Sequence, residues 1–252
     1  MCAATKDGPL ALLVGSRGDL LIQAVDRQIS CLHLPPDDIV NHRVELDNDT
    51  LKLDGRVIDM LLLRCHPQSI IGESFVERDV AFVQGEMRAF MLAACHLETV
   101  YAPVMPDAVT WYEGMSWPVW RRTLKDADTA LAAFRFGGAQ SRGSWVPYRY
   151  GGRRLKPGDQ LATMLGIATT DDEVAETYLL FEGKALGREA KWLDPDVGRT
   201  LREHGIDLAE VAVTEQGAVM SVDVLPNLEP SIADNVATRI LERVHDHRTH
   251  WQ

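Results

Sequence analysis

The sequence predicts an α/β fold, with an N-terminal α/β layer followed by a reduced C-terminal α+β unit. A buried strand, a Gly-containing turn and an amphipathic helix are predicted for PLALLVGSRGDLLIQAVDRQI (9–29). A central strand whose carboxyl end reaches a cleft is predicted for the apolar run MLLLRCH (60–66). A hairpin with a Glu-Gly turn is predicted for TYLLFEGKALG (177–187).

Length and composition bound the domain organisation. The chain has 252 residues, of which 46% are hydrophobic and 25% are charged. This is an ordinary globular composition, and it suffices for one large domain or two small ones. The order of the predicted elements favours two domains, residues 1–110 and residues 111–252, the second with aromatic- and Arg-rich loops.

The remaining N-terminal elements follow from local patterns. We expect a strand at 31–39, stopped by Pro35 and Pro36, and a short hairpin at 44–59 with an Asp-Gly turn. Apolar residues recur at three- and four-residue spacing between 74 and 97, which predicts an amphipathic helix. The segment 100–106 is read as a short strand closed by prolines.

The C-terminal half carries clear start and stop signals. A helix is expected after Pro118, and the Gly- and Arg-rich segment 137–159 is read as a hairpin or a mobile loop pair between subdomains. A helix at 194–205 has an Asp cap, Pro at the next position and Gly at its end. A second hairpin is predicted at 208–226, turning at Gln-Gly, and a capped helix at 231–248.

Charge narrows the choice of partner. The formal net charge is −11, which argues against a nucleic-acid partner because phosphate neutralisation needs a basic face. The middle of the chain is nevertheless basic, since the acids between residues 121 and 156 are only Asp126 and Asp128. The cations there are Arg121, Arg122, Lys125, Arg135, Arg142, Arg149, Arg153, Arg154 and Lys156. A site for a small anion is one interpretation, and a solvated loop with scattered arginines is the other.

Cysteine spacing and apolar runs bear on location. No apolar run approaches the length of a bilayer span, and the start MCAATKDGP lacks the pattern of a signal peptide, so we expect no membrane partner. The four cysteines, Cys2, Cys31, Cys65 and Cys95, match no metal-ligand spacing. We interpret them as reduced thiols of a cytoplasmic protein.

The order of elements resembles the ATP-grasp ligases. The run from PLALLVGSRGD through MLLLRC and SFVERDVAFVQGEMRAFMLAA to VYAPVMPDA is similar to the N-terminal domain of the microviridin-type and ribosomal-modification-type members. That resemblance implies an Asp after the first strand (Asp19), an Arg at the end of the third (Arg64) and a Glu on the long helix (Glu86). TYLLFEGKALG and VAVTEQGAVMSVDVLPNLEP resemble the phosphate-covering hairpin and the closing unit of the grasp.

The departures from that family pattern concern nucleotide binding. Such ligases hold two magnesium ions with an acid on one strand and an acid-x-Asn set on the next. Asp223 fits the second acid, Leu225 stands where the Asn is expected, and Asn227 could substitute only across a bulge. Trp111 stands near a phosphate-binding lysine position, and 134–177 has room for about one hairpin and one short helix. We therefore predict a degenerate ATP-grasp scaffold that uses no cofactor.

The candidate site residues combine a base with an anion pocket. Strand-end Arg-x-His can bind an anion and move a proton, and arginines among aromatics strengthen bidentate hydrogen bonds to anions. Structural roles, a bridging Arg and core aromatics, explain part of the same pattern. The catalytic candidates are Asp19, His66 and Asp223, and the anion- or substrate-binding candidates are Arg64, Arg121, Arg122, Arg149, Lys184 and Arg188.

Three functions are compatible with these residues. The first is an ATP-independent enzyme of natural product biosynthesis, a lyase or cyclase that displaces sulfate or phosphate from a small anionic substrate, free or linked to a carrier protein or peptide. Amine attack closing an aziridine is an example. The second is a carboxylate–amine ligase that uses Mg-ATP through Asp223 and Glu210, with Lys184 or Arg188 on phosphate. The third is a non-catalytic subunit or peptide-binding module. A second subunit completing the site is a further expected partner.

Overall fold

The computed structural model describes most of the chain outside its middle. The described residues are 8–47, 49–65, 77–103, 122, 124–125, 129–131, 135–136, 144–145, 149–150, 153–154, 168–170, 174–187 and 189–251. Contacts divide the chain into two compact units, Met1–Met105 with Asn227–Gln252, and Pro106–Pro226. Each unit is described by itself.

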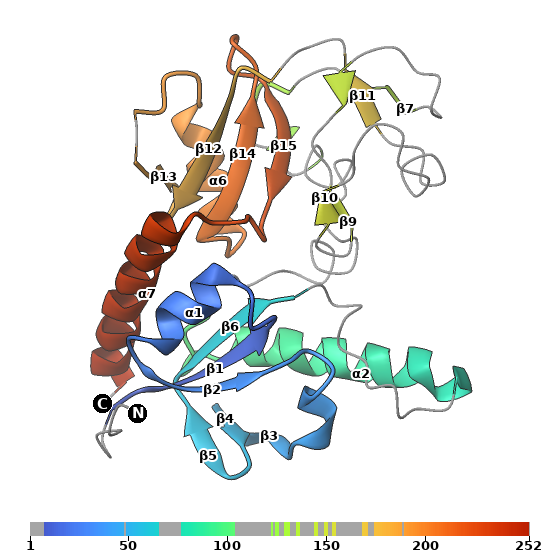
Figure 1. Ribbon diagram of the computed structural model, residues 1–252, viewed down its shortest axis with the longest axis vertical. Coiled ribbons are helices and arrows are strands. Elements are labelled where there is room, and N and C mark those ends of the chain that lie inside the picture. The colour runs from blue at the N-terminus through green and yellow to red at the C-terminus, as the bar shows by residue number, and fades with distance from the viewer. Residues whose placement is uncertain are drawn as a thin grey trace. The chain divides into compact units, whose positions relative to one another are not determined.

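A parallel sheet forms the centre of the first unit (Figure 1). Its strands β1 (Leu10–Gly15), β2 (Ser30–Leu34) and β6 (Met60–Arg64) have the order β2-β1-β6. Every residue of β1 and β6 is buried, as expected for apolar runs in a parallel sheet. A parallel bridge from Met60 to Tyr101 adds a neighbour to the other edge of β6, so the prediction of a central strand at 60–66 is confirmed.

Helices and a small antiparallel sheet complete the described part of the first unit. Helix α1 (Leu20–Asp26) buries Leu21, Ile22, Ala24 and Val25. The long helix α2 (Glu77–Cys95) buries its C-terminal end, whereas Phe82 is exposed. Helix α7 (Pro230–Trp251) packs on α1, where the Arg27 guanidinium lies 2.5 Å from the Asp234 carboxylate.

The small sheet follows the turn signals of the sequence. Strands β3 (Val44–Asp47), β4 (Thr50–Leu53) and β5 (Arg56–Ile58) are antiparallel in the order β3-β4-β5, after a short 3-10 turn at Ile39–Asn41. The turn between β4 and β5 places Asp54 and Gly55 at positive φ (49° and 77°), which Asp-Gly adopts readily. The predicted hairpin is confirmed, and β3 extends it to three strands.

A four-stranded antiparallel sheet forms the core of the second unit. Its strands β12 (Glu176–Phe181), β13 (Lys184–Ala185), β14 (Leu208–Val213) and β15 (Val219–Asp223) have the order β13-β12-β14-β15. Both predicted hairpins are therefore present. Helix α6 (Pro195–Glu203) begins at Asp194, whose carboxylate accepts from the Asp196 amide, and Gly205 follows its end at φ 72°.

The middle of the chain contains more strand than the sequence predicts. Strands β9 (Arg149–Tyr150) and β10 (Arg153–Arg154) pair as the predicted hairpin. Strands β7 (Arg135–Phe136), β8 (Ser144–Trp145) and β11 (Ala168–Thr170) form a further sheet in the order β7-β11-β8. The expectation of one hairpin and one short helix between 134 and 177 was therefore wrong, because pairing across more than twenty residues leaves no local signal.

Two glycines fix how α6 approaches the β12–β13 turn. A Cβ on Gly198 would lie 2.0 Å from the Gly183 carbonyl oxygen. Gly198→Ala is therefore expected to destabilise the protein by roughly 1–3 kcal/mol, as overpacking does. Gly85→Ala is the matched control, because a Cβ on this α2 glycine meets nothing within 4 Å and the change favours a helix by about 0.5–1 kcal/mol. Urea unfolding measures both, and equal stability of Gly198→Ala and wild type would contradict the close packing.

A surface pair makes stability depend on pH. The Asp54 carboxylate accepts a 2.8 Å hydrogen bond from His42 Nδ1, which raises the pKa of His42 and lowers that of Asp54. When the pKa of a histidine is higher in the folded protein than in the unfolded chain, its protonation stabilises the folded protein at pH values below the ordinary pKa. This stabilisation is lost as the pH rises through the raised pKa. His42→Gln should therefore lower the melting temperature more at pH 5.5 than at pH 8.5. Lys52→Gln, which removes the Lys52–Asp47 pair, should lower the melting temperature by the same amount at both pH values.

Candidate functional site

The carboxyl edge of the β2-β1-β6 sheet gathers the polar residues of the first unit. The carboxyl ends of parallel strands meet at one edge, which is where ligands bind in open α/β sheets. Gly15 ends β1 in register with Arg64, which ends β6. His33 is the penultimate residue of β2 and pairs with Leu13. Asp19 follows β1 as the N-cap of α1.

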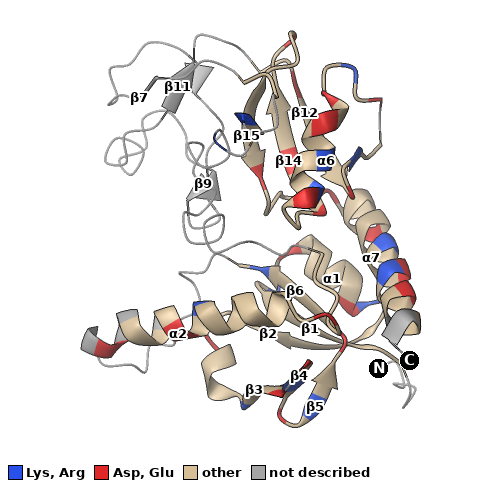
Figure 2. Cartoon of the chain, turned by 180° about the vertical axis from the view of Figure 1, so that it is seen from behind, with Lys and Arg blue, Asp and Glu red and all other residues tan. Residues whose placement is uncertain are grey.

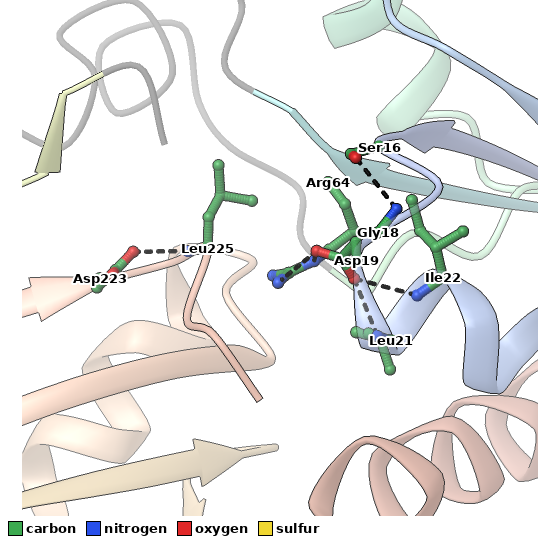
Figure 3. A network of polar contacts seen from close by, with 8 residues as sticks. All are labelled: Ser16, Gly18, Asp19, Leu21, Ile22, Arg64, Asp223 and Leu225. Carbon is green, nitrogen blue, oxygen red and sulfur yellow. Dashed lines mark hydrogen bonds and ion pairs between the residues drawn. The ribbon is translucent and has the colours of Figure 1, made fainter. Parts of the chain in front are cut away.

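Asp19 joins α1 to β6 (Figure 3). Its Oδ1 accepts from the backbone amides of Leu21 (2.9 Å) and Ile22 (3.1 Å), which satisfies two amide donors of the first helical turn. Its Oδ2 lies 3.0 Å from both Nε and a terminal nitrogen of Arg64. Side-chain exposure is 3% for Arg64 and 17% for Asp19. Removing one partner of such a pair costs about 3–5 kcal/mol, so Asp19 is a positioning residue for Arg64.

Gly15 is required by close packing rather than by its backbone angle. A Cβ there would lie 2.5 Å from Cδ1 of Ile22 and 3.0 Å from Cβ of Arg64. The next turn is closed locally, since Ser16 Oγ accepts from the Gly18 amide at 3.1 Å and Ser16 O accepts from the Asp19 amide at 3.0 Å. The carboxyl end of β1 is therefore closely packed, and the turn that follows it is held by local hydrogen bonds.

His33 was missed by the sequence reasoning. Its Nε2 lies 3.0 Å from the carbonyl oxygen of Gly15, so a β2 side chain reaches the end of β1. The available signal was its place in the sequence, a polar residue next to the end of a parallel strand and two positions before Pro35.

The acidic residues of the second unit lie on neighbouring strands. Glu210 of β14 stands directly opposite Asp223 of β15, and directly opposite residues of an antiparallel pair point to the same side of the sheet. Oδ1 of Asp223 also accepts from the Leu225 amide at 2.9 Å. The register shift of this pair lies between Ala212 and Val213, upstream of Asp223.

These residues fit a magnesium–nucleotide site incompletely. Two carboxylates on one side of a sheet suit Mg²⁺, which binds hard oxygen ligands. The residue two positions after Asp223 is Leu225, which has no side-chain oxygen. The register shift of this pair lies upstream of Asp223, where β15 ends. Glu210 and Asp223 thus supply an acid pair, and the residue two positions after Asp223 supplies no amide ligand.

The other predicted site residues are spread over the second unit. Arg122 is helical and exposed, Arg149 lies in β9 paired with Arg154, and Lys184 is exposed in β13. Among the predicted residues, Asp19 and Arg64 are the pair in contact within the described part of the chain. Three predicted residues, His66, Arg121 and Arg188, lie outside the described residues, as does Trp111.

The described cysteines are poor nucleophiles. Burial raises the pKa of Cys65 and Cys95 to about 12. Burial, with a hydrogen bond from Cys31 Sγ to Asp26, also raises the pKa of Cys31 to about 12. All three are free thiols. Thiolate catalysis by these residues is therefore disfavoured near neutral pH.

The described residues offer neither a metal-binding cluster nor a membrane-spanning helix. They include no group of three or more His, Cys, Asp and Glu side chains placed to hold a metal ion. None of the helices in the described part of the chain is long and apolar enough to cross a membrane.

Comparison with known proteins identifies the fold. No protein-family model and no curated protein matches the chain, but solved structures do. The ATP-grasp ligase PsnB, complexed with minimal precursor, Mg and ADP, is 12% identical with a TM-score of 0.63, over 93% of this chain and 98% of that one. The macrocyclase MdnC from Microcystis aeruginosa, bound with its precursor peptide MdnA, is 8% identical with a TM-score of 0.56, over 92% and 99%.

A third structure extends the agreement. The RiPP-associated ATP-grasp ligase from Chryseobacterium gregarium, in complex with ADP and a leader and core peptide, is 11% identical with a TM-score of 0.55, over 93% of this chain and 97% of that chain. The similarity thus covers nearly the whole of each chain, although the identities are low. This chain has an ATP-grasp-like fold, similar to that of ligases that modify peptides.

Proposed function

We propose that this protein is an ATP-independent enzyme that binds an anionic substrate and displaces an anionic leaving group, sulfate or phosphate. The observation that carries the proposal is Leu225, which stands two residues after Asp223 where a magnesium ligand is expected. A leucine cannot coordinate Mg²⁺, and its backbone amide instead donates to Asp223. The acid pair of Asp223 and Glu210 is thereby left without the amide that completes a metal–triphosphate site.

The basic middle of the chain supports an anion pocket. The cations between residues 121 and 156 far outnumber the acids there. Arg122 is exposed, and Arg149 follows Tyr148 and precedes Tyr150 in the sequence. Guanidinium groups bind sulfate, phosphate or carboxylate through paired hydrogen bonds, which strengthen where water is partly excluded. Arg121, Lys184 and Arg188 are proposed to contribute to the same pocket.

The reaction that best matches such a site is an intramolecular displacement. An amine attacks a carbon that carries sulfate or phosphate, the C–N bond forms, and the anion leaves with the C–O electron pair. The arginines stabilise the developing anion, and a base takes the amine proton. The candidate bases are His66 and Asp223, with Asp19 holding Arg64. A small ring such as an aziridine is the expected kind of product.

A peptide-linked substrate is favoured by the structural neighbours. PsnB has been solved with precursor peptide PsnA2, and MdnC with precursor peptide MdnA. We propose that this chain likewise receives its substrate attached to a peptide or carrier protein, within a natural product pathway. A second protein subunit would complete the site in this scheme.

One observation favours a second function, a carboxylate–amine ligase that uses Mg-ATP. Glu210 stands opposite Asp223, and two carboxylates on one side of a sheet provide the hard oxygen ligands that Mg²⁺ binds. In that function the two carboxylates would hold Mg²⁺, and Lys184 would contact phosphate. The ion and nucleotide would supply carboxylate activation.

Nucleotide binding separates the two functions. We expect Mg-ATP to leave the melting temperature of the wild type unchanged, because Leu225 offers no ligand. A ligand present at 100 times its Kd raises the free energy of unfolding by about 2.7 kcal/mol. Each kcal/mol raises the melting temperature by ~2–4 °C. Leu225→Asn restores an amide oxygen and should introduce a Mg²⁺-dependent shift, whereas the matched control Leu225→Ala should not. A Mg²⁺-dependent shift of several degrees in the wild type would establish the ligase instead.

Anion binding tests the arginines. Sulfate should raise the melting temperature of the wild type, and Arg122→Ala or Arg149→Ala should weaken sulfate binding roughly 10-fold or more, since a charge-assisted hydrogen bond contributes about 1.5–3 kcal/mol. Arg199→Ala is the matched control, because Arg199 is an exposed arginine of α6 paired with Asp196. Equal weakening in all three variants would point to nonspecific charge and remove the proposed pocket.

A further inference from the structure

His33 lies at the carboxyl edge of the parallel sheet without a role in the fold's apolar core. It is partly exposed, whereas the residues of the neighbouring strand β1 are all buried. Its recorded polar contact is the 3.0 Å approach of Nε2 to the Gly15 carbonyl oxygen. A polar, partly exposed ring at this edge is in the place where open α/β sheets bind ligands.

The register places His33 and Arg64 on the same side of the sheet. In a parallel sheet, paired residues point to the same side, and so do residues two apart on one strand. His33 pairs with Leu13, and Arg64 pairs with Gly15, two residues further along β1. Gly15 of β1 lies between them, and Ile22 fills the space beside it, since a Cβ on Gly15 would lie 2.5 Å from Ile22 Cδ1. The imidazole and the Asp19–Arg64 pair therefore belong to the two strands that flank β1.

The contact with Gly15 fixes the tautomer of His33. A carbonyl oxygen can only accept a hydrogen bond, so Nε2 carries the hydrogen. In the neutral ring the lone pair then resides on Nδ1. Nδ1 has no polar partner among the described residues. The backbone of β1 thus orients the ring, as second partners orient catalytic imidazoles.

We infer that His33 is a catalytic base of the carboxyl edge, accepting through Nδ1 a proton from an amine or hydroxyl group of the substrate. The inference rests on the proposed function for the identity of the reaction. The N–H or O–H bond of the nucleophile breaks, its electron pair remains on the nucleophile, and the proton resides on Nδ1 until water removes it. The Gly15 carbonyl stabilises the resulting imidazolium through Nε2–H.

Chemical labelling tests whether Nδ1 is available. Diethyl pyrocarbonate reacts with an unprotonated imidazole nitrogen, and His33 and His42 lie on the same tryptic peptide, residues 28–43. His42 is the internal control, because Nδ1 of this ring is hydrogen-bonded to Asp54 and its raised pKa favours the protonated form. We expect His33 to be labelled at least several-fold faster than His42 at pH 7, as measured by mass spectrometry.

The tautomer provides a second, independent measurement. In full-length protein labelled with ¹⁵N-histidine, we expect long-range ¹H–¹⁵N spectra to show His33 protonated at Nε2 and unprotonated at Nδ1. His33→Gln assigns the signal by its loss. That variant keeps an amide donor near the position of Nε2, so its melting temperature should stay within about 2 °C of wild type. A hydrogen on Nδ1, or labelling no faster than that of His42, would overturn the inference.

Failure of this inference is distinguishable from failure of the proposed function. Labelling and the tautomer are measured without nucleotide or anion, so a Mg-ATP response in the wild type leaves them unchanged. Conversely, His33→Gln should retain the sulfate-induced rise in melting temperature, since no arginine is removed. Loss of that rise in His33→Gln would show that the substitution has a general effect on the protein, and the assignment as a base would be withdrawn.

Discussion

The carboxylate of Asp19 ties together the elements that end at the carboxyl edge of the first unit. One oxygen starts α1 through two backbone amides, and the other holds the guanidinium of Arg64 at the end of β6. The pair is nearly buried, so its charges are stable only in each other's presence. Ile22, whose amide donates to Asp19, also approaches Gly15 so closely that a Cβ there would lie 2.5 Å from its Cδ1.

In the second unit, the backbone fold does not determine which ligands the side chains bind. The four-stranded sheet is held by ladder hydrogen bonds and buried apolar residues, and these persist whichever side chains line its other positions. Leu225, two residues after Asp223, has no side-chain oxygen. A fold shared with ligases does not by itself establish the use of their cofactors, so function has to be argued from the individual residues.

The polar residues at the carboxyl edge of the first unit have two roles, which are the structural pairing of Asp19 with Arg64 and the proton transfer proposed for His33. Asp19 and Arg64 satisfy one another, whereas His33 has one ring nitrogen bound to the backbone and the other directed to no described partner. A rigid edge and an oriented imidazole form the arrangement that proton transfer requires, because the base must be positioned before its substrate arrives. A side chain in place of Gly15 would collide with Ile22 and Arg64 at this edge.

Local signals in the sequence determined most of the elements: the Asp19 and Asp194 caps, the Asp-Gly and Glu-Gly turns, and the apolar strands β1 and β6. The resemblance to ATP-grasp ligases implied an amide at the position where the sequence has Leu225. The tertiary structure alone decided the pairing of Glu210 with Asp223, the β7-β11-β8 sheet, the packing of α7 on α1, and the contact of His33 with Gly15. Each of these joins residues distant in the chain, and register and packing between distant segments are set by the whole fold rather than by neighbouring residues.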